Sequence, residues 1–252
     1  MLKTERMDRV RAALRAQGLT QMIVCDPKSV WYLTGVAVEP YERLLALYLP
    51  TEGEPVLFLN RLFNVPEPPC RTVWHTDTDK PVAQIAEVVD AGRPLGIDKE
   101  WPAKFLIPLM ETHPGMQVVL SSDCVDDCRA CKDAEEQALM REASRINDAV
   151  NEAAKHYIKA GMTEREVAEF IDAQFRAHGC EGPSFTTIVS FGANAADPHH
   201  EPDDTVLKEG DCVLFDMGCV KSRYCSDMTR TWFCGQPTEK QAAVHDLVRR
   251  AN

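Results

Sequence analysis

The chain has 252 residues, of which 44% are hydrophobic and 27% are charged; these shares are near the averages for folded globular proteins. Its formal net charge of −11 argues against nucleic acid and against an anionic membrane surface as partners, because both need clustered Lys and Arg. The length suffices for one large domain or two ordinary ones.

The N-terminal residues run directly into an amphipathic pattern, so we expect no signal peptide. The longest apolar run, residues 44–49, is too short to span a bilayer. Without an export signal, the ten cysteines are expected to be reduced thiols in a cytoplasmic protein.

The first half of the chain alternates helical and strand patterns. A helix is predicted over residues 3–16, with Gly18 where its C-cap would lie. Short apolar runs predict buried strands, two of which flank a Gly-containing loop as in a hairpin. These runs are residues 22–25, 44–49, 55–59, 95–97 and 117–120. The pattern predicts an α/β domain over residues 1–125.

The second half opens with two long helices. Asp133 and Glu136 form a capping-box pattern ahead of an amphipathic helix that is predicted to end at Gly161. Thr163 starts a second helix, and Gly179 is predicted to stop it.

Strand patterns follow at residues 186–190, 212–217 and 228–233. Thr238 and Gln241 form another capping box, and the chain stops at Asn252 within the helical pattern behind it. We therefore predict a second, α+β domain over residues 126–252.

Two aspartates stand out among these last strands. If residues 212–217 and 228–233 lie on a hairpin whose tip is Lys221-Ser222, Asp216 pairs directly with Asp227. Like charges directly opposite one another destabilise a sheet. Two facing carboxylates are tolerated when they share a proton or bind a cation. The pattern thus suggests a site for a divalent metal, which favours such oxygen ligands.

A register shifted by one residue would instead send the two aspartates to opposite faces, where they would simply meet solvent. Both registers are compatible with the spacing. Two carboxylates also cannot complete a metal site, so other ligands would have to come from elsewhere.

His199 and His200 lie in a loop bounded by Pro198 and Pro202, just before the hairpin. Either could be a metal ligand, a general acid or base, or a hydrogen-bond donor to substrate. A histidine without further context usually has none of these roles.

Cys124, Cys128 and Cys131 have the spacing of an iron–sulfur signature. They lie beside the start of a long helix, and Asp123, Asp126 and Asp127 would repel an anionic cluster. We therefore interpret Cys128 and Cys131 as packing residues.

An ordered set of motifs resembles the Xaa-Pro peptidases, the prolidase and aminopeptidase P branch of the pita-bread metallopeptidases. Two further motifs resemble the creatinase-like N-terminal domain of this family and the beginning of its catalytic domain. The motifs are Trp31–Gly35, Arg129–Ala143, Ser184–Val189, Asn194–His199, Gly210–Gly218 and Ser226–Thr231.

This resemblance implies an α/β creatinase-like domain followed by an α+β pita-bread catalytic domain. It implies that Asp216 and Asp227 bind metal, and that His199 binds substrate and steadies the tetrahedral intermediate. His200 matches no functional position of the family. Two divalent ions, manganese or cobalt with zinc as the alternative, would be bridged by a hydroxide that attacks the carbonyl before proline. The resemblance further implies proline-containing peptides as substrates and a homodimer.

The family's remaining ligands, one His and two Glu, follow the helix that begins near Thr238, and we find no substitute for them upstream. We therefore expect a catalytic domain truncated at its C-terminus. Two alternatives remain: a creatinase-like amidinohydrolase, against which the retained aspartates argue, and a non-catalytic module that lacks three metal ligands.

Overall fold

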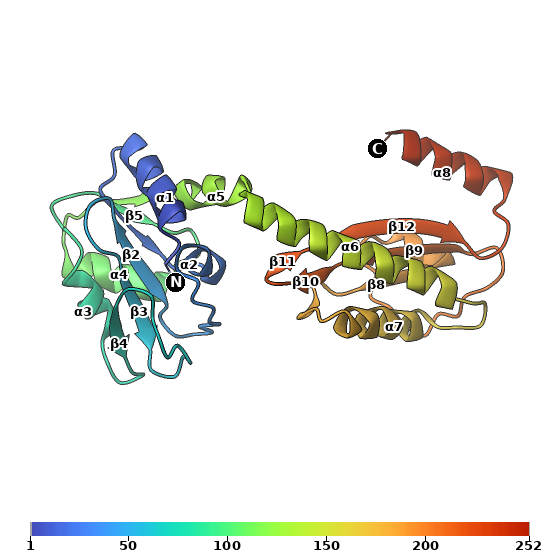
Figure 1. The fold of residues 1–252 in the computed structure, drawn as a ribbon, viewed down its shortest axis with the longest axis horizontal. Helices are drawn as coiled ribbons and strands as arrows, with labels where there is room; N and C mark the ends of the chain where they lie inside the picture. The colour runs from blue at the N-terminus through green and yellow to red at the C-terminus, as the bar shows by residue number, and fades with distance from the viewer. Residues whose placement is uncertain (1, 252) are drawn as a thin grey trace. The chain divides into compact units, whose positions relative to one another are not determined.

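The structure, a computed structural model, describes residues 2–251. They divide into two compact units, of which unit 1 ends at Lys132 and unit 2 begins at Asp133. Each unit has its own helices and strands (Figure 1). Among these residues, unit 1 contains two hydrophobic core clusters and unit 2 contains one.

Unit 1 is built on a six-stranded mixed sheet in the order β4-β3-β2-β1-β5-β6. The central strand β2 pairs antiparallel with β1 and with β3, whereas the outer pairs β3–β4, β1–β5 and β5–β6 are parallel. The predicted hairpin is therefore confirmed as β2 and β3. The strands are β1 Gln21–Val24, β2 Ala46–Pro50, β3 Val56–Asn60, β4 Arg71–His75, β5 Leu95–Ile97 and β6 Val118–Leu120.

Both faces of this sheet are covered. Successive residues of β1 belong to different clusters, with Met22 and Val24 in one core and Ile23 in the other, as the period of a strand requires. The first core takes residues from α1 and α5, and the second takes Ile85 of α3 and Leu109 of α4. The helices of unit 1 are α1 Thr4–Ala16, α2 Pro27–Thr34, α3 Pro81–Ala86, α4 Ala103–Thr112 and α5 Asp123–Ala130.

The helices of unit 2 begin where their capping patterns predict. They are α6 Ala134–Tyr157, α7 Glu164–Ala177 and α8 Glu239–Ala251. Both long helices carry reciprocal capping boxes, Asp133 with Glu136 and Thr163 with Glu166. The predicted end of α6 at Gly161 is wrong, because the backbone is already extended at Ile158, with ψ 137°.

Two three-stranded sheets complete unit 2, in the orders β12-β9-β8 and β11-β10-β7. The strands are β7 Gly182–Pro183, β8 Ile188–Phe191, β9 Cys212–Met217, β10 Cys219–Lys221, β11 Tyr224–Cys225 and β12 Met228–Phe233. The predicted bounds of β9 and β12 are confirmed. A 3₁₀ turn, η1 Gly192–Ala196, follows β8.

Strand β9 has one buried face. Val213, Phe215 and Met217 are at most 3% exposed and belong to the core that α6 and α7 share with the sheet, whereas Leu214 and Asp216 are half-buried. The strand thus separates an apolar side from a side on which polar residues are tolerated.

The predicted pairing of Asp216 with Asp227 is wrong. In the ladder of β9 and β12, Asp216 pairs with Thr229. The reason is the turn, which lies at Ser222 and Arg223 rather than at Lys221-Ser222. Both turn residues have positive φ, 50° and 67°, the geometry of the two-residue turns that match strand twist. The register therefore differs from the prediction by two residues.

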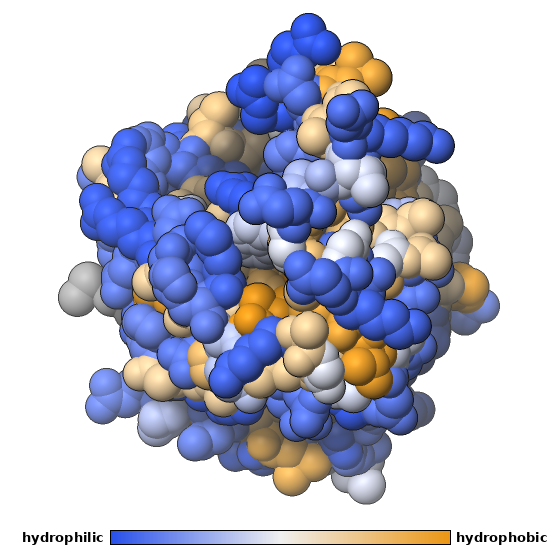
Figure 2. Space-filling model, turned by 90° about the vertical axis from the view of Figure 1, so that its right-hand side faces the viewer, coloured by the Kyte–Doolittle hydropathy of each residue, from blue (hydrophilic) through white to orange (hydrophobic). Residues whose placement is uncertain are grey.

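The face of the molecule in Figure 2 is mostly hydrophilic, with smaller hydrophobic patches between the hydrophilic residues. Across residues 2–251, no helix is both long and apolar enough to cross a bilayer. All ten cysteines lie within this range and are free thiols.

Candidate functional site

Asp216 lies on the half-buried side of β9, between two neighbouring strands. Its pairing partners are Ile188 of β8 and Thr229 of β12. The Thr229 hydroxyl donates a hydrogen bond of 2.9 Å to Asp216 Oδ1. At the end of the same strand, the Asn147 amide of α6 donates to the Met217 carbonyl at 3.0 Å. The Thr229 hydroxyl therefore orients the Asp216 carboxylate, and the hydrogen bond from Asn147 of α6 holds the end of β9 in place.

Asp227 is exposed and directly precedes β12. It lies two residues before Thr229, so strand alternation directs it to the side of the sheet that carries Asp216. The residue beside it is fixed, because buried Ser226 accepts the Cys219 N–H on its hydroxyl at 3.0 Å and the Ser184 hydroxyl on its carbonyl at 2.8 Å.

Gly218 is needed at this point because the two strands approach closely. A Cβ atom at Gly218 would lie 2.0 Å from the Ser226 carbonyl oxygen, a separation that no side chain permits. The glycine thus holds the segment before Asp227 against the end of β9.

His199 is exposed, in the segment that follows β8 and η1. Its N–H donates to Asp197 Oδ1 at 3.0 Å, which closes a local turn. Asp216 therefore lies on the half-buried side of β9, strand alternation predicts the same side for Asp227, and the His199 segment follows β8, the other neighbour of β9. Within the described residues, no hydrogen bond or ion pair joins the His199 ring to either aspartate.

A second cluster of chemically active residues, which the sequence analysis did not identify, lies beneath this segment. Glu164, His200 and Asp203 have potential ligand atoms within 4.8 Å of one another, and they form the single group of this kind among residues 2–251. The cluster joins the start of α7 to a loop more than thirty residues away. No local sequence pattern therefore predicts that these three residues lie together.

The hydrogen bonds of Glu164 argue for a structural network here rather than a metal site. Its Oε1 accepts the Phe191 N–H at 2.7 Å and the Asn194 amide at 3.0 Å. Its Oε2 accepts His200 Nε2 at 2.6 Å and the Asp203 N–H at 3.2 Å. An ionised carboxylate offers about four acceptor positions, and all of them have donors. A metal would have to displace these donors.

Asp203 is also held within the chain. The Thr205 hydroxyl and N–H hydrogen-bond to its carboxylate and lower its pKa below the usual range; the N–H lies 2.7 Å from Oδ1. The Asp203 carboxylate therefore stabilises a local turn by accepting hydrogen bonds from Thr205.

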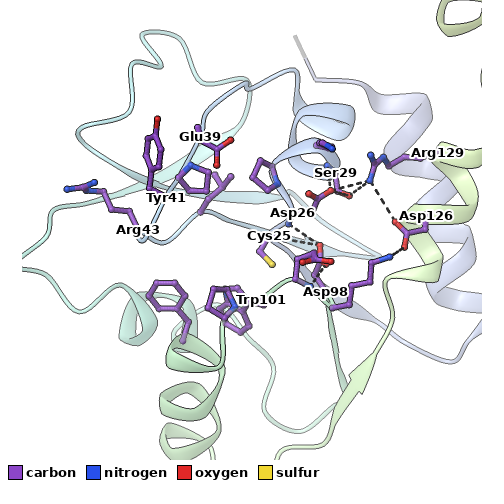
Figure 3. Close-up of a pocket in the computed structure, with 18 residues that line it drawn as sticks. Cys25, Asp26, Ser29, Glu39, Tyr41, Arg43, Asp98, Trp101, Asp126 and Arg129 are labelled. Atoms are coloured by element: carbon purple, nitrogen blue, oxygen red, sulfur yellow. Dashed lines mark hydrogen bonds and ion pairs between the residues drawn. The ribbon is translucent and has the colours of Figure 1, made fainter. Parts of the chain in front are cut away.

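A cavity of about 560 Å³ lies at the carboxyl ends of β1 and β5 in unit 1. Figure 3 shows Cys25 and Asp98 on one side, Tyr41 and Arg43 on another, and Trp101 below them. None of the predicted site residues lines it. Burial and the neighbouring Asp98 raise the pKa of Cys25 far above its usual range, so this thiol stays protonated.

The three cysteines with iron–sulfur spacing lie on or at the end of α5. Cys124 is buried and Cys128 packs against the first core of unit 1, whereas Cys131 is exposed. Packing is therefore confirmed for Cys128 and is wrong for Cys131, because the helix ends at Ala130 and releases the next side chain to solvent.

Comparison with known families matches nearly the whole chain. Residues 6–131 match the creatinase/prolidase N-terminal domain, and residues 138–252 match metallopeptidase family M24. The predicted combination of a creatinase-like domain with a pita-bread domain is thereby confirmed.

Individual relatives agree. The chain is 30% identical over 246 residues to an uncharacterised peptidase of Staphylococcus epidermidis, covering 96% of this chain and 70% of that protein. Among solved structures, a prolidase from Thermococcus sibiricus matches 100% of this chain and 71% of its own, with a TM-score of 0.91 and 29% identity. A dipeptidase from Mycobacterium ulcerans matches 98% of this chain and 69% of its own, with a TM-score of 0.89 and 30% identity.

The motifs, the two-unit fold and these matches agree with one another. The chain belongs to metallopeptidase family M24, in the Xaa-Pro peptidase group that carries a creatinase/prolidase N-terminal domain.

Proposed function

We propose that this protein takes part in metal-dependent hydrolysis of peptides at Xaa-Pro bonds. The observation that supports the proposal is the pairing of Asp216 with Thr229, two residues after Asp227, inside the region that matches the M24 family. The similar solved structures include a prolidase and a dipeptidase, which supports short peptides as substrates.

The substrate explains the need for a dedicated site. An Xaa-Pro bond is a tertiary amide without an N–H, and the proline ring fixes φ near −65°. A general peptide-binding groove that relies on the backbone N–H loses its hydrogen bond at this position. A pocket shaped for the ring recovers that loss.

The donor chemistry of the residues fits a divalent metal. Both side chains supply carboxylate oxygens, the ligands that hard and borderline divalent ions accept. Asp216 and Asp227 would hold the metal, and the Thr229 hydroxyl, 2.9 Å from Asp216 Oδ1, orients the first of them. When bound, the metal supplies Lewis-acid activation of the attacking water and of the scissile carbonyl.

His199 acts on the substrate in this proposal. Its ring is exposed, so it is accessible to a bound peptide. An imidazole N–H donates a hydrogen bond to the carbonyl oxygen of the scissile peptide. This hydrogen bond becomes stronger as negative charge develops on the oxygen in the transition state. Loss of this donor costs about 10²-fold to 10³-fold in rate in comparable sites.

The test is hydrolysis of an Ala-Pro dipeptide by the purified protein with manganese, cobalt or zinc, with Ala-Ala as the control substrate. We expect cleavage of Ala-Pro in preference to Ala-Ala, and its loss in Asp227→Asn and Asp216→Asn. Asp148→Asn, on an exposed carboxylate of α6, should retain activity. Absence of proline-specific hydrolysis with every metal, or full activity of Asp227→Asn, would refute the proposal.

One observation favours a second candidate, a non-catalytic binding module. Among residues 2–251, Asp216 and Asp227 have no third His, Cys, Asp or Glu ligand grouped with them. Two carboxylates alone bind divalent ions weakly. Calorimetry discriminates the two candidates, since tight, stoichiometric manganese binding excludes the second. No observation favours an amidinohydrolase over a peptidase.

Four finer expectations stay predictions from the sequence. They are the choice among manganese, cobalt and zinc, the presence of two metal ions rather than one, a homodimer, and a cytoplasmic location. Metal analysis of the purified protein and its mass in solution test the first two and the oligomeric state.

A further inference from the structure

The segment that carries His199 converges on one buried carboxylate. Glu164 is fully buried, with a side-chain exposure of 0%, beside His200 with 15%. It accepts hydrogen bonds from Phe191, Asn194, His200 and Asp203, which are spread over thirteen residues of chain. A single side chain therefore ties together the beginning, the middle and the end of the loop.

The backbone reinforces this convergence at the end of the segment. Glu164 N–H donates to the Thr205 carbonyl at 3.2 Å, and Arg165 N–H donates to the Asp203 carbonyl at 3.1 Å. The Arg165 side chain pairs with Asp204 at 3.1 Å, although both groups are largely exposed. The loop is thus held by hydrogen bonds to the first residues of α7.

His199 is exposed to solvent, although it lies within the segment that Glu164 holds. Its neighbour His200 turns inward to Glu164 at 2.6 Å, while His199 is exposed and its N–H is fixed by Asp197. With His200 anchored, the adjacent residue has little freedom to move along the surface. The hydrogen bond that anchors His200 therefore restricts where the backbone of His199 can lie.

We propose that Glu164, together with His200, is a positioning residue for His199. A carboxyl group buried this deeply costs free energy unless its hydrogen bonds are satisfied, and the groups that satisfy those of Glu164 all belong to the segment that carries His199. Glu164 fixes the loop in one conformation, so that the His199 ring meets the substrate without an entropic cost at each turnover. This inference rests on the proposed function, since His199 acts on substrate only there.

The first test needs no catalysis. Amide hydrogen exchange and the ring NMR signals of His199 are compared between the full chain, Glu164→Gln and Glu169→Gln. Glu169 lies exposed on the same helix, so it is a matched control. In Glu164→Gln we expect exchange over residues 192–206 to rise about tenfold or more, with the His199 ring signals broadened. Exchange in β9 and β12 should be unchanged.

If Glu164→Gln does not fold, His200→Ala carries the same test, because it removes one donor at the edge of the cluster and leaves the other three. The expected change is then confined to residues 197–203. Unaltered exchange and unaltered His199 signals in Glu164→Gln, or in His200→Ala where Glu164→Gln does not fold, would overturn the proposal.

The second test separates positioning from general stability. If Glu164 acts through His199, Glu164→Gln should lower kcat/KM in the native background and have no further effect in a His199→Ala background. Independent, multiplying effects in the double variant would contradict the proposal. If the native protein hydrolyses no peptide, the proposed function fails, and the exchange and NMR results alone decide the inference.

Discussion

The sheets of the two units differ in how many of their faces are buried. In unit 1, every residue of β1, β2 and β3 is buried, because helices cover both faces. In unit 2, β9 alternates buried and half-buried residues, and Asp216 occupies the less buried side. A sheet with two apolar cores has no place for a carboxylate that must reach a ligand. The metal site that we propose therefore lies where one face of the sheet is free of a core.

The largest expected effects come from core truncations that test this difference directly. In β9, Phe215→Ala should lower the free energy of unfolding by about 3–5 kcal/mol, since Phe215 is 0% exposed. Leu214→Ala, on the half-buried side, should cost less than about 1.5 kcal/mol. In β3, Leu57→Ala and Phe58→Ala should each cost about 2–5 kcal/mol, because both residues are 0% exposed.

Urea denaturation followed by circular dichroism measures all four variants. Equal costs for Leu214→Ala and Phe215→Ala would mean that β9 is buried on both faces, and the contrast between the units would be lost.

A glycine in each unit allows a smaller comparison. At Gly218 an added Cβ meets the Ser226 carbonyl oxygen at 2.0 Å, whereas at Gly96 it meets the Ser121 hydroxyl at 2.4 Å. A hydroxyl can rotate away, but a backbone carbonyl cannot. Gly218→Ala should therefore cost about 3 kcal/mol or more and Gly96→Ala about 1 kcal/mol. Thermal unfolding measures both, and the reverse order would show that the strands beside Asp227 separate easily.

The smallest effect concerns the turn that sets the register. Ser222 and Arg223 both have positive φ, which Asn and Gly adopt at lower cost. The double variant Ser222→Asn with Arg223→Gly should gain about 0.5–1 kcal/mol. Asn-Gly placed at Lys221 and Ser222 serves as the control and should destabilise, because Lys221 is paired in β10. A gain in the control instead would favour the register in which Asp216 faces Asp227.

Local signals made much of unit 2 predictable. The capping pairs at Asp133 and Thr163 involve residues three apart, so they can be read directly from the chain, and α6 and α7 begin where these pairs predict. The alternation of β9 and β12 also depends only on neighbouring residues. By contrast, α2 was not predicted. Its N-cap Asp26 and its first residue Pro27 come directly after the strand predicted over residues 22–25, where this pair is equally typical of a strand end.

The features that were mispredicted or not recognised depend on residues far apart in the sequence. The turn at Ser222-Arg223 contains neither Gly nor Asn, so nothing in the sequence marks its tip, and the pairing partner of Asp216 was wrong by two positions. The shift by an even number keeps both aspartates on one side of the sheet. The Glu164 network could not be predicted at all, since its donors come from a loop that begins twenty-seven residues later.

The most direct test of the account is a manganese titration of the full chain, followed by electron paramagnetic resonance of the free ion. We predict that Asp216→Asn and Asp227→Asn each weaken binding at least about tenfold, while Asp203→Asn, in the hydrogen-bonded network of Glu164, leaves it unchanged. Unchanged binding in both aspartate variants, or loss of binding in Asp203→Asn alone, would contradict the assignment of the metal site to the open side of β9 and β12.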